Sequence, residues 1–134
     1  MKKYIFAISV LLASSSAFSA VQAPLAEVIF KDSSKLHKYT LIKEGKTPVF
    51  KLVFQVNQQK PKTRTLSQSQ ADSIRNDMTR IIWTTLSRKP ASTQKCHRYV
   101  SMSSGTDKAD VCMENRKVTG MTYGLLNSMS QLFR

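Results

Sequence analysis

The sequence predicts an α+β domain, in which a small curled antiparallel β-sheet packs against one main α-helix at about residues 67–88. Three observations support this fold class. In residues 49–57 every second residue is apolar and belongs to one face, which is the period of a β-strand. Residues 67–88 carry a capping signal followed by apolar residues at helical spacing. Residues 96–114 have the pattern of a β-hairpin that carries both cysteines of the chain.

The N-terminus has the organisation of a bacterial secretory signal peptide. Residues 1–3 are a short basic start, residues 4–12 are apolar, and residues 13–20 are small and mostly polar. The apolar run is too short to span a bilayer as a helix, which needs about 20 apolar residues. We therefore expect residues 1–19 to be a signal peptide that is cleaved after export.

Cleavage would leave residues 20–134 as a single small domain, soluble in the periplasm or outside the cell. No cysteine lies near the cut to carry a lipid anchor, and no later segment is apolar enough to span a membrane. The chain has 21 lysines and arginines, two of them in the signal peptide, so the mature domain has 19 against 8 acidic residues, a net charge of +11. This excess predicts attraction to anions, and a generally basic, solvated surface is the alternative interpretation.

Strands are expected in the first half of the mature domain. Residues 28–30 are a short apolar run, and residues 38–44 and 49–57 read as two strands joined by a short turn. Phe50, Leu52, Phe54 and Val56 recur with period two and are assigned to the core. Residues 58–65 are polar and read as a linker to the main helix.

The main helix has a clear start and a clear end. Ser67 is a good N-cap, Gln70 completes a capping box, and Pro90 stops the helix. The apolar stripe consists of Ala71, Ile74, Met78, Ile81, Ile82 and Leu86. Trp83 lies one residue off this stripe, and we expect it in the core as well.

The last segment, residues 117–133, has two interpretations. Its apolar residues, Val118, Met121, Leu125, Met129 and Leu132, fit a helical stripe. Gly120 and Gly124 each cost about 1 kcal/mol in a helix relative to alanine, so a strand leading into a shorter helix is the alternative. We favour a C-terminal helix, in which the glycines permit close packing on the sheet.

Cys96 and Cys112 are predicted to form a disulfide, because an even number of cysteines in an exported protein suggests pairing. A hairpin centred on Ser104 would place the two cysteines opposite each other. Gly105 would then take the left-handed last position of a three-residue loop. In this register the core face would carry His97, Tyr99, Ala109, Val111 and Met113.

No active site is predicted, and no cofactor or metal is expected. The chain has no Gly-x-Ser-x-Gly elbow, phosphate-binding glycine loop or His-Glu-x-x-His motif. A zinc site would need more ligands than two cysteines and two distant histidines readily supply. One enzyme alternative remains, a small basic secreted nuclease that uses His37 and His97 as general acid and base. Ordinary strand residues are the simpler interpretation of both histidines.

Two basic clusters are candidate sites for an anion or a partner. They flank the main helix and consist of Lys60, Lys62 and Arg64 before it and Arg88, Lys89 and Lys95 after it. A helix of about 20 residues separates its ends by about 30 Å, so the clusters are not expected to form one patch. Nucleic acid is a possible but unspecific ligand, because stacking would require aromatic residues beside these cations.

These observations favour an exported, non-enzymatic binding protein that recognises an acidic macromolecule, either a protein or an envelope polymer. Two further alternatives stay open, an inhibitor or immunity protein for a secreted enzyme and a subunit of an envelope assembly. In the inhibitor alternative the hairpin loop would contact the enzyme through Ser103, Ser104, Gly105, Thr106 and Asp107. The sequence leaves the identity of the partner and the oligomeric state open.

Overall fold

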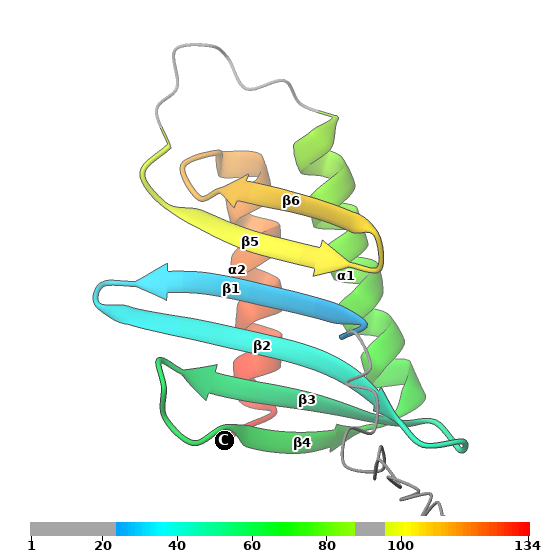
Figure 1. The fold of residues 1–134 in the computed structure, drawn as a ribbon. Helices are drawn as coiled ribbons and strands as arrows, with labels where there is room; N and C mark the ends of the chain where they lie inside the picture. The colour runs from blue at the N-terminus through cyan, green and yellow to red at the C-terminus, as the bar shows by residue number, and fades with distance from the viewer. Residues whose placement is uncertain (1–23, 88–95) are drawn as a thin grey trace, which may run out of the picture.

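The computed structural model describes residues 24–87 and 96–134, which form a six-stranded antiparallel sheet and two helices (Figure 1). In chain order the elements are β1 (Ala26–Asp32), β2 (Lys35–Glu44), β3 (Val49–Val56), β4 (Lys62–Leu66), α1 (Gln68–Leu86), β5 (Tyr99–Ser104), β6 (Asp107–Cys112) and α2 (Arg116–Gln131). The strand order is β4-β3-β2-β1-β5-β6. The predicted α+β class, with one main helix and a C-terminal helix, is confirmed.

Both helices lie on one face of the sheet, which Figure 1 shows from the opposite side. Alternate strand residues point toward the helices and form the core, among them Val28, Tyr39, Leu41, Phe50, Leu52, Val100, Met102 and Val111. Of the four predicted core residues of β3, Phe50 and Leu52 are buried and Phe54 packs against the core. Val56 is only partly buried and does not belong to the core. The described elements leave the other face of the sheet uncovered (Figure 1).

Helix α1 begins as predicted. The Ser67 side chain accepts a hydrogen bond from the Gln70 amide at 3.2 Å, and the Gln70 side chain accepts one from the Ser67 amide at 2.9 Å. This capping box satisfies two amides that the first turn of a helix leaves without partners. The buried stripe consists of Ala71, Ile74, Met78, Ile81 and Ile82.

The predicted burial of Trp83 and Leu86 is wrong. Each side chain is 59% exposed. Trp83 lies next to the buried stripe and not in it. The last turn of α1 extends past the edge of β6 (Figure 1). Pro90, which was expected to stop the helix, lies outside the described residues.

The segment predicted as a polar linker contains the edge strand β4. Asn57 takes a positive φ of 50° and turns the chain, after which Thr63 pairs with Val53 on β3. Every residue of β4 except Leu66 is exposed. The strand therefore lacks an apolar alternation, and only its pairing with β3 identifies it.

The disulfide between Cys96 and Cys112 is confirmed, but the hairpin register differs from the prediction. Tyr99, not Cys96, lies opposite Cys112, and the turn is formed by the two residues Gly105 and Thr106. Gly105 has a φ of 62° at the first central position, where a type II′ turn favours glycine. Cys96 precedes β5, so the disulfide joins the approach to one strand with the end of the other.

This register reverses the predicted faces of β5. Val100 and Met102 are buried, whereas Tyr99 is 52% exposed and His97 is also exposed. The pairing of Met102 with Val28 on β1 fixes this face, because a shift by an odd number of residues turns a strand over. The predicted core face of β6, with Ala109 and Val111, is confirmed.

Helix α2 confirms the favoured interpretation of the C-terminal segment. The Asn115 side chain caps its start by accepting a hydrogen bond from the Lys117 amide at 3.2 Å. Val118, Leu125 and Met129 are buried on its inner face. The predicted close packing of the glycines is wrong, because a Cβ atom at Gly120 or Gly124 would have no neighbour within 4 Å in the described part of the chain.

Replacing Gly124 by alanine is expected to raise the free energy of unfolding by about 1 kcal/mol, since alanine restricts the unfolded chain and favours the helix. Thermal unfolding followed by circular dichroism would measure the change. Gly105→Ala is the matched control and should destabilise the protein, because Gly105 also has open space around it but a φ of 62°. A lower unfolding temperature for Gly124→Ala would contradict the open environment of this glycine.

Candidate functional site

The positive charge is concentrated in one half of the sheet. We call residues 35–66, which form β2, β3, β4 and their turns, the basic half. Its eight basic residues are Lys35, Lys38, Lys43, Lys46, Lys51, Lys60, Lys62 and Arg64, and Glu44 is its only acidic residue. By contrast, residues 96–117 of the hairpin and the start of α2 have four basic and three acidic residues. The charge excess therefore does not spread evenly over the described residues.

Only two cations of the basic half form ion pairs with described residues. Lys38 lies 3.3 Å from a Glu27 carboxylate oxygen, and Lys51 lies 2.6 Å from one of Glu44. The other six are exposed and have no carboxylate within 4.0 Å in the described part of the chain. Their charges are therefore available to an external anion.

The first predicted basic cluster lies within this half. Lys60 is in the turn before β4, and Lys62 and Arg64 are on β4 itself, at the free edge of the sheet. All three are exposed. The second predicted cluster, Arg88, Lys89 and Lys95, lies outside the described residues. Sequence reasoning missed the wider basic half, because Lys35, Lys43 and Lys46 lie at strand ends and turns rather than in a run.

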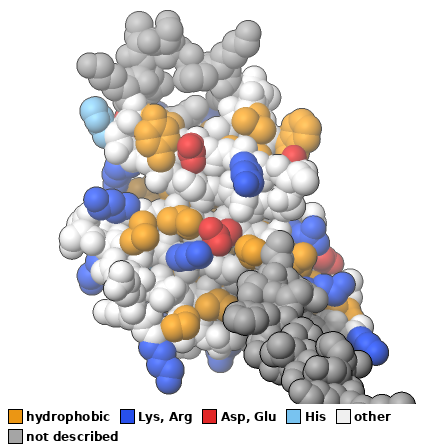
Figure 2. Space-filling view, viewed as in Figure 1, with side chains coloured by type: hydrophobic (Ala, Val, Ile, Leu, Met, Phe, Trp, Pro, Cys, Tyr) orange, Lys and Arg blue, Asp and Glu red, His pale blue; other side chains and the backbone are white. Residues whose placement is uncertain are grey.

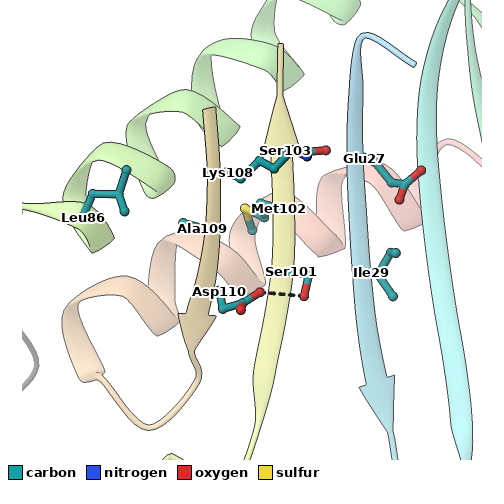
Figure 3. A pocket seen from close by; sticks show the side chains of 9 residues that line it. All are labelled: Glu27, Ile29, Leu86, Ser101, Met102, Ser103, Lys108, Ala109 and Asp110. Carbon is teal, nitrogen blue, oxygen red and sulfur yellow. Dashed lines mark hydrogen bonds between the residues drawn. The ribbon is translucent and has the colours of Figure 1, made fainter. Parts of the chain in front are cut away.

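The uncovered face of the sheet carries hydrophobic, basic and acidic side chains in a mixed arrangement (Figure 2). Over β1, β5 and β6 this face has a hollow of about 530 Å³, which Figure 3 shows from close by. Ser101 on its floor donates a hydrogen bond to the Asp110 carboxylate at 2.8 Å. Glu27, Lys108 and Asp110 give the hollow mixed charge, and no histidine lines it to act as a base toward Ser101.

The predicted hairpin contact is a tight turn and not a projecting loop. Ser103 lines the hollow of Figure 3, and Ser104 is buried at 8% exposure. The Gly105 amide donates a hydrogen bond to the Leu25 carbonyl at 3.1 Å, which ties the turn to the start of β1. Thr106 is exposed, so a partner could reach this part of the turn without reaching Ser104.

The two histidines have different surroundings. The His37 ring stacks on Phe30 at 4.6 Å and on Phe54 at 5.9 Å, and its Nε2 atom is buried without a hydrogen-bond partner among the described residues. His97 is exposed, and its backbone amide donates to the Glu114 carboxylate at 3.2 Å. Neither histidine lines the hollow of Figure 3. This arrangement gives no support to a shared acid–base site.

Other groups with acid–base or ligand chemistry have structural roles. Tyr39 stacks on Phe54 at 4.6 Å, and burial raises the pKa of its hydroxyl above the usual value, so it is a neutral core residue. The Cys96, Cys112 and Glu114 side chains lie close enough to share a metal ion. The two sulfur atoms are bonded to each other, however, and so cannot bind zinc as thiolates.

A second, smaller hollow lies where the end of β1, the start of β5 and α2 meet, and we call it the β1–β5–α2 pocket. It has a volume of about 300 Å³ and is lined by Phe30, Lys31, Asp32, Arg98, Tyr99, Val100, Met113, Tyr123 and Leu126. Sequence reasoning missed these residues as a site, because they come from three distant segments. Neither described helix combines the length and the apolar composition needed to cross a membrane. Comparison of the chain with protein-family models, curated proteins and solved structures finds no match.

Proposed function

We propose that this chain is an exported binding protein that recognises an acidic macromolecule through its basic half. The supporting observation is the six exposed cations of residues 35–66 that form no ion pair with described residues, beside a single acidic residue in the same range. Export is supported by the signal-like residues 1–19, with which the disulfide is compatible. Binding is favoured over catalysis, because neither the hollow of Figure 3 nor the β1–β5–α2 pocket contains a histidine or a cysteine.

The free edge at β4 is the part of the basic half that we expect to contact the partner first. Lys62 and Arg64 lie on an edge strand whose outer side has no neighbouring strand among the described residues. Long basic side chains at such an edge discourage pairing with neutral strands. They attract an acidic surface over about a Debye length, which is about 10 Å at 0.1 M salt.

The test is a comparison of three variants, each of which removes three positive charges. In the first, Lys60, Lys62 and Arg64 are replaced by alanine, and immobilised polyglutamate and heparin serve as probes. We expect about a tenfold loss of affinity for at least one probe at low salt, because exposed charge pairs contribute about 0.2–1 kcal/mol each. The matched control replaces Lys108, Arg116 and Lys117 by alanine and should bind almost as well as the unchanged protein. The third variant replaces Arg88, Lys89 and Lys95 and tests the other predicted cluster.

Equal losses in the first variant and in the matched control would show that affinity follows net charge alone, and the proposed role of the basic half would be rejected. The affinity should also fall steeply between 0.1 and 1 M salt, where the Debye length shrinks to about 3 Å. Binding that is insensitive to salt would point to an apolar interface instead.

A further inference from the structure

We infer that the β1–β5–α2 pocket binds an apolar side chain of an acidic protein partner, with a neighbouring carboxylate of that partner contacting Arg98. This inference rests on the proposed function and narrows the acidic macromolecule to a protein. It follows from three properties of the pocket, namely an apolar floor, an aromatic rim and two cations beside one acidic residue.

The floor of the pocket is apolar and belongs to the core. Val100 is 2% exposed, and Met113 and Leu126 are each 7% exposed. The volume of about 300 Å³ is at the lower end of the range for ligand pockets. The pocket therefore suits one or two side chains rather than a large ligand. Burying an apolar side chain there would remove it from water without unpairing a polar group.

The rim carries two tyrosines that are half exposed. Tyr99 is 52% exposed at the start of β5, and Tyr123 is 50% exposed on α2. Tyrosine is enriched at the energetic centres of protein interfaces, because its ring provides apolar contact and its hydroxyl a hydrogen bond. Two such rings beside an apolar floor are typical of a recognition site and are not needed for the core.

The charges at the pocket favour an anion beside the apolar group. Lys31, Arg98 and Asp32 line it, and none of the three forms an ion pair with a described residue. An arginine can bind a carboxylate through two parallel hydrogen bonds. A sugar or phosphate polymer with repeating charges offers no large apolar side chain, whereas an acidic peptide offers both groups, and this chemistry favours a protein.

The backbone around Arg98 is held in place before any partner arrives. The Met113 amide donates a hydrogen bond to the Arg98 carbonyl at 2.9 Å. The disulfide ties Cys96, two residues before Arg98, to the end of β6. A preformed pocket loses less conformational freedom on binding, which favours affinity.

The test uses the mature chain and two labelled peptides of eight residues. One peptide contains seven glutamates and a central phenylalanine, and its twin has alanine at that position. We expect the phenylalanine peptide to bind at least about tenfold more tightly by fluorescence anisotropy, because a buried aromatic side chain is worth that much or more. Tyr123→Ala should lower the affinity for the phenylalanine peptide by about the same factor and leave the affinity for the alanine peptide unchanged. Arg98→Ala should weaken both peptides.

Two control variants separate the pocket from general effects. Trp83→Ala removes an aromatic side chain that is 59% exposed and outside the pocket, and it should leave both affinities unchanged. Tyr123→Phe keeps the ring and should retain most of the preference for phenylalanine. Because Tyr123 is half exposed, its variants should fold, and their circular dichroism spectra would check this.

The outcomes distinguish this inference from the proposed function. Equal binding of both peptides, lost on replacement of Lys60, Lys62 and Arg64, would support the proposed function and overturn the pocket inference. Binding of heparin but of neither peptide would identify a polymeric anion as the partner class and also overturn it. Failure of polyglutamate, heparin and both peptides to bind would overturn both proposals.

Discussion

Replacing Ile82 by alanine is expected to lower the free energy of unfolding by about 2–5 kcal/mol. Ile82 is fully buried on the face of α1 that packs against the sheet. Truncation removes apolar contacts and leaves a cavity that the surrounding side chains fill only in part. Urea denaturation would show a lower midpoint. The slope of the free energy of unfolding against urea concentration should not change, since the fold and the surface exposed on unfolding stay the same.

Two control variants test whether this loss of stability depends on which face of α1 packs against the sheet. Ile82→Val removes one methyl group and should cost about 0.5–1.5 kcal/mol. Trp83→Ala removes a much larger side chain from the next position, yet it should change the stability little, because Trp83 is 59% exposed. If Trp83→Ala were as destabilising as Ile82→Ala, α1 would have to pack on the sheet through a different face.

The elements with strong periodicity could be predicted from the sequence alone. The capping box at Ser67 and the stripe from Ala71 to Ile82 identify α1, because local hydrogen bonds and a buried face act together there. Strand β4 could not be predicted, since it is exposed on both sides and gains its structure from pairing with β3. The hydrophobic pattern of a segment therefore predicts its secondary structure where one face is buried, but not at an exposed edge of a sheet.

In the hairpin, too, the local sequence did not determine which side chains face the core. Turn chemistry and the cysteines predict one register, yet pairing of β5 with β1 imposes another and buries Val100 instead of Tyr99. The same dependence on distant segments hid the β1–β5–α2 pocket, in which Arg98 and Tyr123 meet only after folding. The cluster from Lys60 to Arg64 could be found, because charge on an exposed segment needs no partner to remain at the surface.

Replacing Cys96 and Cys112 together by alanine is expected to lower the free energy of unfolding by about 3 kcal/mol. The two cysteines are 16 residues apart, and the bond restricts the unfolded chain over this distance. The expected value follows from the entropy of closing a loop of about this length in the unfolded chain. Urea denaturation of the double variant and of the reduced, unchanged protein should give similar losses.

The disulfide should also affect recognition at the β1–β5–α2 pocket. Without the bond, the chain before Arg98 loses its covalent link to β6. The hydrogen bonds of the Met113 amide to the Arg98 carbonyl at 2.9 Å and of the His97 amide to Glu114 at 3.2 Å remain. The double variant should therefore show a weaker preference for the phenylalanine peptide even in the absence of urea. Ile82→Ala is the matched control, because it lowers stability through α1 by about 2–5 kcal/mol and does not touch a residue that lines the pocket. An equal loss of preference in both variants would mean that general stability, and not the position of Arg98, governs binding.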